Sequence, residues 1–360
     1  MPSKMLLPPS KRRLAFVDWL RLVASIQMIL GHTIEALLSE AWRKGRLFEL
    51  WTLWRGLTAP AFLFASGFAF ALAARLDRPG PPSGRLRRLR RGLLLIALGT
   101  LLHLGDVPHR IDILQTIGFI LIFFELVVAS LPSRRARLLV SAILGLGVAI
   151  GSERLDALVN AKAAQGLLRF GLSWVDPGGP ALFPLFPWTS YAALGLTFSL
   201  WLAPNGPESE TRSLPLRLGV IAIALAFFSM LAWKLWGPPS AHWSAAPSVI
   251  FGRLSGVTLL CAIFALLSSR WRLPPWAEFL SGQSLNLYLA HLTLIYAPFF
   301  GWARLWGPSL SLAQSLLASV LALALSAAWP FLLQRLFLPL GPFNRKFMRL
   351  NEPPLRSGRN

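Results

Sequence analysis

The residues best suited to chemistry lie on one face of the first apolar segment, residues 15–38. At about 100° per residue, a helix over this segment brings six of them within an arc of roughly 100°. They are Asp18, Arg21, Ser25, Met28, His32 and Glu35. His32 follows Arg21 by about 16 Å along the helix axis. The face therefore predicts a cation near one end of the helix and, toward the other end, a base that titrates near neutral pH.

These residues also have structural interpretations. Asp18 and Arg21 are spaced i,i+3, so an ion pair at the membrane surface explains them equally well. A histidine inside a helix bundle can be packed and hydrogen-bonded without a further role. Because His32 shares its face with several other polar groups, we favour a functional role for it.

A second polar face is predicted in the segment 278–300. Ser281, Ser284, Tyr288 and His291 fall on one side of a helix over this segment. A polar seam that holds neighbouring helices together explains this pattern equally well. If the face is functional, we expect Tyr288 and His291 to line a substrate pocket.

The connection near residues 103–115 is short and rich in polar side chains. They are His103, Asp106, His109, Arg110, Asp112 and Gln115. We expect His103, Asp112 and Gln115 to contact an acceptor, with a solvated turn as the structural alternative. A metal site built from His103, Asp106 and His109 lacks a further ligand at a dependable spacing, so we expect no metal.

The composition places the chain among membrane proteins. Of its 360 residues, 54% are hydrophobic and 14% are charged, and the mean hydropathy is +0.55, whereas soluble domains carry about 25% charged residues. The net charge of +21 comes from basic residues in short connections between apolar segments, so we expect no nucleic-acid partner. The single cysteine, Cys261, excludes an intrachain disulfide framework.

Ten segments are apolar enough to be predicted as transmembrane helices. Their ranges are 15–38, 51–74, 92–105, 111–131, 138–152, 181–203, 216–236, 247–268, 278–300 and 311–338. Arginines and lysines concentrate in every second connection, which places both termini in the cytoplasm under the positive-inside rule. The predicted fold class is all-α, a polytopic membrane helix bundle with about ten transmembrane helices.

The chain is expected to hold one membrane domain between two cytoplasmic tails. The tails are residues 1–14 and the basic residues 341–360, and the transmembrane domain is residues 15–340. The expected location is the cell (inner) membrane, with the lipid bilayer as a partner. This topology places His32 toward the outer side and the arginine-rich connections on the inner side.

Five segments, in order along the chain, resemble the membrane acyltransferase superfamily. They are RLAFVDWLRLVASIQMILGH, TAPAFLFASGFAFAL, DILQTIGF, LFPWTSYAALG and LNLYLAH. The first carries the family's Asp-x-x-Arg and a histidine eleven residues after the arginine, here Asp18, Arg21 and His32. Family members often have glycine directly after this arginine, whereas this chain has Leu22. The difference affects the expected local packing and leaves the expected chemistry unchanged. Together the segments look most like the bacterial relatives of heparan-alpha-glucosaminide N-acetyltransferase, with the acyltransferase-3 branch as the close alternative.

The resemblance implies transfer of an acetyl group from cytoplasmic acetyl-CoA, or of an acyl group from another acyl-CoA, to a sugar amine or hydroxyl on the outer side. His32 would act as the general base, with Asp18 and Arg21 completing the catalytic motif. Transient acetylation of His32 is the alternative. Glu35, one turn further, would orient His32 or bind the sugar. The phosphates of CoA would bind the inner-side cations Arg21, Arg87 and Arg88.

Two other classes of protein fit parts of the same pattern. A proton-coupled transporter also has polar stripes, intramembrane histidines and a kinked helix, as Pro184 and Pro187 predict at the start of the sixth segment. A non-catalytic membrane assembly subunit would need the same stripes for stability alone. Turnover of acetyl-CoA would favour the enzyme, and solute flux without an acyl donor would favour the transporter.

Overall fold

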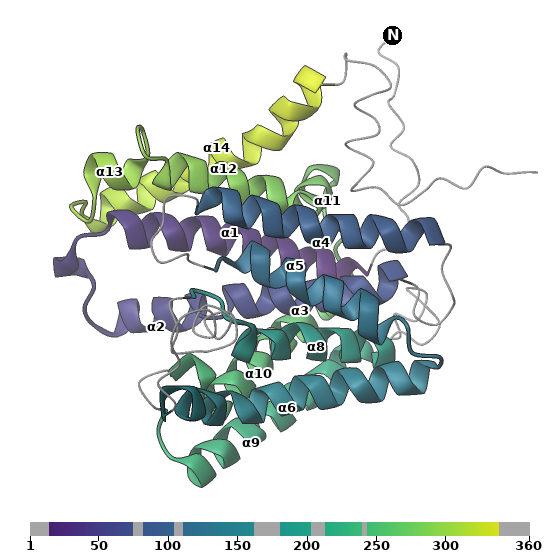
Figure 1. Ribbon diagram of the computed structural model, residues 1–360. Coiled ribbons are helices and arrows are strands. Elements are labelled where there is room, and N and C mark those ends of the chain that lie inside the picture. Colours follow the sequence, from purple (N-terminus) through teal and green to yellow (C-terminus); the bar gives the residue numbers. More distant parts are fainter. Residues whose placement is uncertain are drawn as a thin grey trace, which may run out of the picture. The chain divides into compact units, whose positions relative to one another are not determined.

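The computed structural model describes residues 14–74, 82–103, 111–161, 181–202, 213–239 and 243–337 (Figure 1). Within these ranges the chain is helical, and the one β-type contact is an isolated bridge between Leu38 and Leu310. The α-helices are α1 (Ala15–Leu37), α2 (Arg46–Arg55), α3 (Thr58–Ala74), α4 (Pro82–Leu102), α5 (Ile113–Phe123), α6 (Arg134–Ala161), α8 (Leu185–Leu202), α9 (Leu214–Trp236), α10 (Pro247–Ser268), α11 (Pro275–Gly282), α12 (Ser284–Tyr296), α13 (Trp302–Trp306) and α14 (Leu312–Phe337). Short helical turns are η1 (Glu40–Trp42), the π-helical η2 (Phe124–Val128) and η4 (Trp243–Ala245).

Six helical stretches among the described residues are long and apolar enough to cross a membrane. They are α1, the stretch Arg46–Ala74 that joins α2 and α3, Arg134–Arg154 of α6, α9, α10, and Leu312–Leu336 of α14. This confirms a helical membrane protein. The other predicted segments also fall on helices, namely α4, α5 with η2, α8, and α11 with α12. The count of ten crossings and the placement of both termini stay predictions.

Four predicted segments differ from the structure in extent or continuity. The segment predicted at 51–74 is divided between α2 and α3. Helix α4 begins ten residues before the predicted residue 92, because its arginine-rich first half is helical although it is not apolar. Helix α6 likewise runs past both ends of its apolar core. The segment predicted at 278–300 is two helices, because Gln283 has non-helical angles (φ −103°, ψ 19°) between α11 and α12. The predicted break in the sixth segment is confirmed, with non-helical angles at Phe186.

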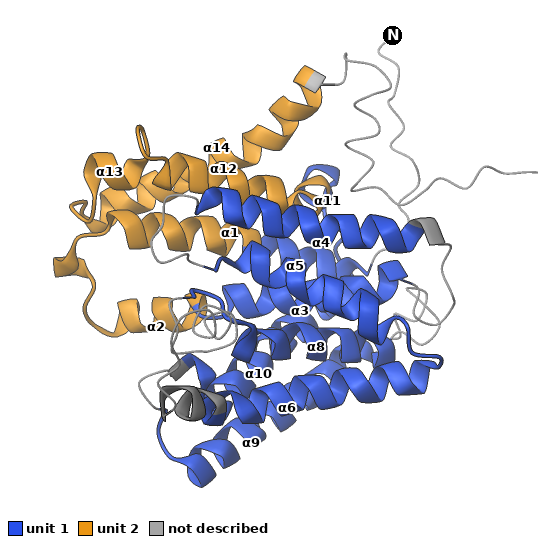
Figure 2. Cartoon of the chain, in the orientation of Figure 1, with its two compact units in different colours: residues 1–24, 56–278 blue, residues 25–55, 279–360 orange. Residues whose placement is uncertain are grey.

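The described residues form two compact units, which Figure 2 colours separately. Unit 1 comprises residues 1–24 and 56–278, and unit 2 comprises residues 25–55 and 279–360. In unit 1 the helices pack mainly as the pairs α3–α8, α6–α8, α9–α10 and α4–α5. In unit 2, α12 packs against α14, and backbone hydrogen bonds join the end of α1 to the chain before α14 at Leu310.

A close contact between two helices of unit 1, α3 and α8, depends on two glycines. A Cβ atom added at Gly67 in α3 would lie 1.8 Å from the carbonyl oxygen of Ala192 in α8. A Cβ atom at Gly195 in α8 would lie 2.1 Å from the carbonyl oxygen of Phe64 in α3. Because backbone blocks both positions, only glycine permits this approach. Small residues allow such close packing of membrane helices.

We therefore expect Gly67→Ala and Gly195→Ala each to destabilise the protein by about 1–3 kcal/mol or more, through overpacking. Gly147→Ala in α6 is the matched control, because no atom lies within 4 Å of its added Cβ. Thermal unfolding of the detergent-purified variants measures the difference. Equal stability of the three variants would contradict the close contact between α3 and α8.

Candidate functional site

His32 in α1 and His291 in α12 are hydrogen-bonded to each other within unit 2. The Nδ1 atom of His32 lies 2.8 Å from the Nε2 atom of His291. The two ring centroids are 5.1 Å apart and the ring planes differ by 5°. This separation is about one hydrogen-bond length plus a ring radius on each side, so the rings lie edge to edge in nearly one plane. Two histidines from distant parts of the sequence thus form a linear N–H···N contact.

The carbonyl of Leu287 determines which nitrogen of each histidine carries the proton. The Nδ1 atom of His291 lies 2.9 Å from this oxygen, which can only accept a hydrogen bond. In neutral His291, Nδ1 therefore donates and Nε2 accepts, so the Nδ1 of His32 must carry the donated hydrogen. Neutral His32 then keeps an unprotonated Nε2. This atom has no hydrogen-bond partner among the described residues.

Two tyrosines of α12 help to hold the histidine pair. Tyr288 meets the ring of His291 edge to face, with centroids 5.5 Å apart. Tyr296 meets His32 in the same manner at 6.2 Å, and its hydroxyl lies 3.4 Å from the backbone oxygen of His32. His291 is fully buried, whereas His32 is partly accessible. The accessible member is therefore also the one with the available base nitrogen.

Helix α2 is fixed against α1 beside His32. The Gln27 amide donates to the backbone oxygen of Trp54, and the Arg55 guanidinium forms an ion pair with Glu35. The side chain of Arg55 passes over Gly31, where an added Cβ would lie 3.2 Å from its Cγ and Cδ atoms. Because Gly31 directly precedes His32, Arg55 crosses α1 next to the histidine.

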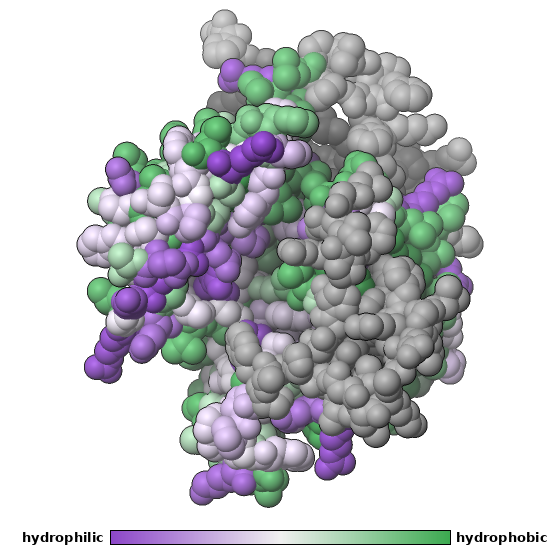
Figure 3. Space-filling view, turned by 60° about the vertical axis from the view of Figure 1, so that its left-hand side comes forward, coloured by the Kyte–Doolittle hydropathy of each residue, from purple (hydrophilic) through white to green (hydrophobic). Residues whose placement is uncertain are grey.

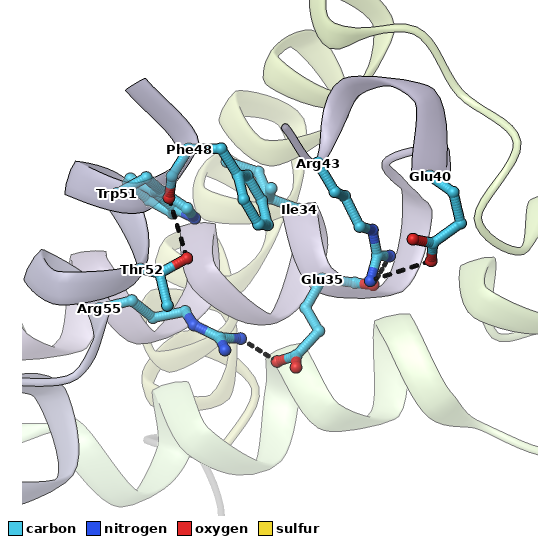
Figure 4. Close-up of a pocket in the computed structure, with 8 residues that line it drawn as sticks. All are labelled: Ile34, Glu35, Glu40, Arg43, Phe48, Trp51, Thr52 and Arg55. Atoms are coloured by element: carbon cyan, nitrogen blue, oxygen red, sulfur yellow. Dashed lines mark hydrogen bonds and ion pairs between the residues drawn. The ribbon is translucent and has the colours of Figure 1, made fainter. Parts of the chain in front are cut away.

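A pocket of about 340 Å³ lies within unit 2 at this crossing (Figure 4). Its lining residues are Ile34, Glu35, Glu40, Arg43, Phe48, Trp51, Thr52 and Arg55. Arg43 shapes one wall, because it donates to the backbone oxygens of Leu38 at 3.0 Å and Glu35 at 2.6 Å. The pocket thus combines two carboxylates, two guanidinium groups and two aromatic rings, and one of its carboxylates, that of Glu35, lies one helical turn from His32 in α1.

The polar residues predicted near residues 103–115 belong to unit 1 and have local partners. Asp112 caps α5 by accepting from the backbone N–H of Ile113 at 2.7 Å. Gln115 completes the capping box, because its side-chain oxygen accepts from the backbone N–H of Asp112 at 2.8 Å. Both side chains therefore stabilise the start of α5. His103 follows the end of α4, and Asp106, His109 and Arg110 lie outside the described residues.

The proposed phosphate-binding arginines differ in their surroundings. The Nε and Nη2 groups of Arg88 donate hydrogen bonds to the carboxylate of Glu125, at 2.6 and 3.0 Å. Glu125 lies in the π-helical turn η2 and is 2% exposed. Arg87 is partly buried on another side of α4. Asp18 is buried and Arg21 partly buried in the unit 1 part of α1, and each has an interaction within the structure.

The sequence interpretation missed two arginines. Arg55 lies in the second predicted apolar segment, and Arg253 lies inside α10 with its guanidinium 5.8 Å from the ring centroid of Trp188. The available signal was the presence of a charge inside an apolar segment, which marks a functional candidate by default. Among the residues that the structure describes, no three His, Cys, Asp or Glu side chains gather as a metal site would require.

The described chain is therefore a helical membrane protein with a histidine pair and a charged pocket in unit 2, and Figure 3 shows both apolar and hydrophilic side chains on one face of its surface. The sequence profile of the family described as heparan-alpha-glucosaminide N-acetyltransferase, catalytic, matches residues 13–232, and the chain belongs to this family. No curated protein matches the chain. The family match includes His32 and ends before α12, so His291 lies outside it. The predicted family is confirmed, and the bacterial branch stays a prediction.

Proposed function

We propose that the chain transfers the acetyl group of acetyl-CoA to an amine or hydroxyl of a sugar or glycan, with His32 as the general base. The observation that carries the proposal is the hydrogen bond between His32 and His291, because it leaves Nε2 of His32 as the free base. Membership of an N-acetyltransferase family supports the class of reaction. A positioned histidine typically accelerates such a transfer by about 10²–10⁴-fold.

In the proposed step, Nε2 of His32 takes the proton of the acceptor amine or hydroxyl as the acceptor attacks the thioester carbonyl. The new bond joins the acceptor atom to the acetyl carbon, and the carbon–sulfur bond breaks. The leaving thiolate then takes the proton from Nε2. While His32 is positively charged, its Nδ1–H donates to Nε2 of His291, which stabilises the imidazolium.

We assign the pocket beside His32 to the acceptor. Trp51 and Phe48 offer aromatic faces for the apolar side of a sugar ring. Glu35 and Arg55 offer charged, planar groups that can hydrogen-bond neighbouring hydroxyls or an amine. A pocket with apolar walls and a few convergent polar groups is typical of small-ligand sites. The acceptor would thus be held one helical turn from the base.

For the donor, we keep Arg21, Arg87 and Arg88 as the proposed partners of the CoA phosphates. Because Glu125 already binds Arg88, we expect Arg88 to contribute least to acetyl-CoA affinity. Asp18 remains a proposed member of the catalytic motif. Four other residues remain proposed acceptor contacts, namely His103, Asp112, Gln115 and Tyr288. We expect Asp112 and Gln115 to contribute less to acceptor binding, because their side chains cap α5.

Labelled acetyl-CoA and the probe acceptors glucosamine and glucose test this proposal in proteoliposomes of the full chain. Acetylated sugar and free CoA should appear in equal amounts. Trp51→Ala should raise the KM for the acceptor by about tenfold and leave the KM for acetyl-CoA unchanged, because a stacking face is lost.

Trp54→Ala is the matched control, because Trp54 is on the same helix and does not line the pocket. It should keep the wild-type KM values. Equal effects of the two variants would contradict the acceptor assignment. Sugar flux into liposomes without any acetyl-CoA turnover would overturn the transferase and favour a carrier.

A further inference from the structure

The arginines in the first half of α4 point in two directions. Arg88 and Arg85 face the protein, where Glu125 pairs with both, at 2.6 Å and 3.8 Å. Arg90 and Arg91 are exposed, and Arg87 beside them is partly buried. At about 100° per residue, Arg90 and Arg91 lie together on the side of α4 that faces away from Glu125. We call these two residues the outer arginines.

The face of α4 that carries the outer arginines continues as an apolar ridge. Leu93, Leu94 and Leu101 are 59%, 38% and 62% exposed. The opposite face is packed on α5, because an added Cβ at Gly92 would lie 2.6 Å from Ile122 and one at Gly99 would lie 2.7 Å from Gln115. In a membrane protein, an exposed row of leucines on a helix packed from one side faces lipid chains.

Charged side chains on a lipid-facing ridge are stable only where they reach the headgroups. Arg90 lies one helical turn before Leu94 on the same line of the helix. Among the described residues, no carboxylate forms an ion pair with Arg90 or Arg91, and Glu125 is already bound by Arg88. The outer arginines therefore form a patch of positive charge at the boundary between lipid chains and headgroups.

We propose that the outer arginines bind the phosphate groups of anionic phospholipids, with the leucine ridge of α4 against their acyl chains. A guanidinium group binds phosphate oxygens through two parallel hydrogen bonds. The phosphate headgroup of an anionic lipid would lie at the outer arginines, and its acyl chains would lie along the leucine ridge that follows them in α4. A CoA phosphate is the other source of such chemistry, but it would have to bind on the lipid side of α4.

A fluorescent probe on the ridge tests the lipid assignment. Leu94→Cys is labelled with bimane in the full chain, whose own Cys261 is fully buried. The protein is reconstituted in vesicles of phosphatidylcholine and phosphatidylglycerol at about 4:1, with bromine on the chains of one lipid or the other. Brominated phosphatidylglycerol should quench several-fold more, mole for mole, because each exposed cation favours an anionic lipid by about fivefold.

Arg90→Gln with Arg91→Gln should abolish this preference, so that both brominated lipids quench in proportion to their abundance. Arg270→Gln with Arg272→Gln is the matched control, since it removes two exposed arginines from another connection. Equal quenching per mole of each brominated lipid, with Arg90 and Arg91 intact, would overturn the proposal. So would a preference that survives Arg90→Gln with Arg91→Gln, or a loss of acetyl-CoA affinity in that variant with the lipid preference intact.

Discussion

Replacing His32 with alanine should lower kcat for acetyl transfer by about 10²–10⁴-fold, because no other described group beside the pocket offers a free base nitrogen. The KM for acetyl-CoA should change little, since the proposed role of His32 begins when the acceptor loses its proton. Steady-state release of CoA, with glucosamine as the probe acceptor, measures both constants. Binding of acetyl-CoA without acceptor separates a lost base from a lost donor site.

His242→Ala is the control for His32→Ala. It removes a histidine to which no role in the reaction is assigned, and it should keep most of the activity. Retained transfer in His32→Ala would exclude His32 as the base. Detection of an acetyl group on wild-type His32 after a rapid acid quench would indicate a covalent intermediate in place of base catalysis. His32→Ala would lower kcat in that mechanism as well.

The positions of His32 and His291 on their helices could be predicted from the sequence, because a helical period places residues on a face without any tertiary information. Their hydrogen bond could not be predicted, because the two residues are 259 positions apart in sequence. The interruption at Gln283 also changes the orientation of α12 relative to a continuous helix over 278–300. The polar character of α12 was thus predictable, and its partner on α1 was not.

The pocket could not be predicted from the sequence, because hydropathy does not distinguish α2 from α3. The sequence interpretation placed Arg55 inside an apolar segment that begins at residue 51, whereas the structure ends α2 at Arg55 and starts α3 at Thr58. That separate ten-residue helix gives α1 a partner within unit 2 and a wall for the pocket.

The capping role of Asp112 could have been predicted from the sequence. An Asp followed three positions later by Gln, directly before an apolar run, is a signature of a capping box. The structure forms this motif at the start of α5. A polar cluster at a helix start should therefore be tested for capping before it is assigned to a ligand.

The second prediction concerns His291, which we propose as a positioning residue for His32. His291→Leu removes the acceptor for the His32 Nδ1–H and keeps an apolar side chain of similar reach in a fully buried position. The His32 ring then loses both its orientation and its tautomer. We expect kcat to fall by about 10²-fold or more, because loss of the orienting partner of a catalytic histidine has an effect of this order or larger.

His291→Gln is the discriminating variant. Its side-chain oxygen can accept the hydrogen bond from Nδ1 of His32, so it should recover a large part of the activity that His291→Leu loses. If His291 were itself the base, Gln and Leu would be equally inactive, because neither can take a proton. If His291 only filled space, Leu would be the better replacement and the pH profile of kcat would not move. We therefore expect kcat to decrease from wild type to His291→Gln to His291→Leu, and the pH profile of kcat to change in His291→Leu. This result follows from the geometry in which Leu287 orients His291 and His291 orients His32.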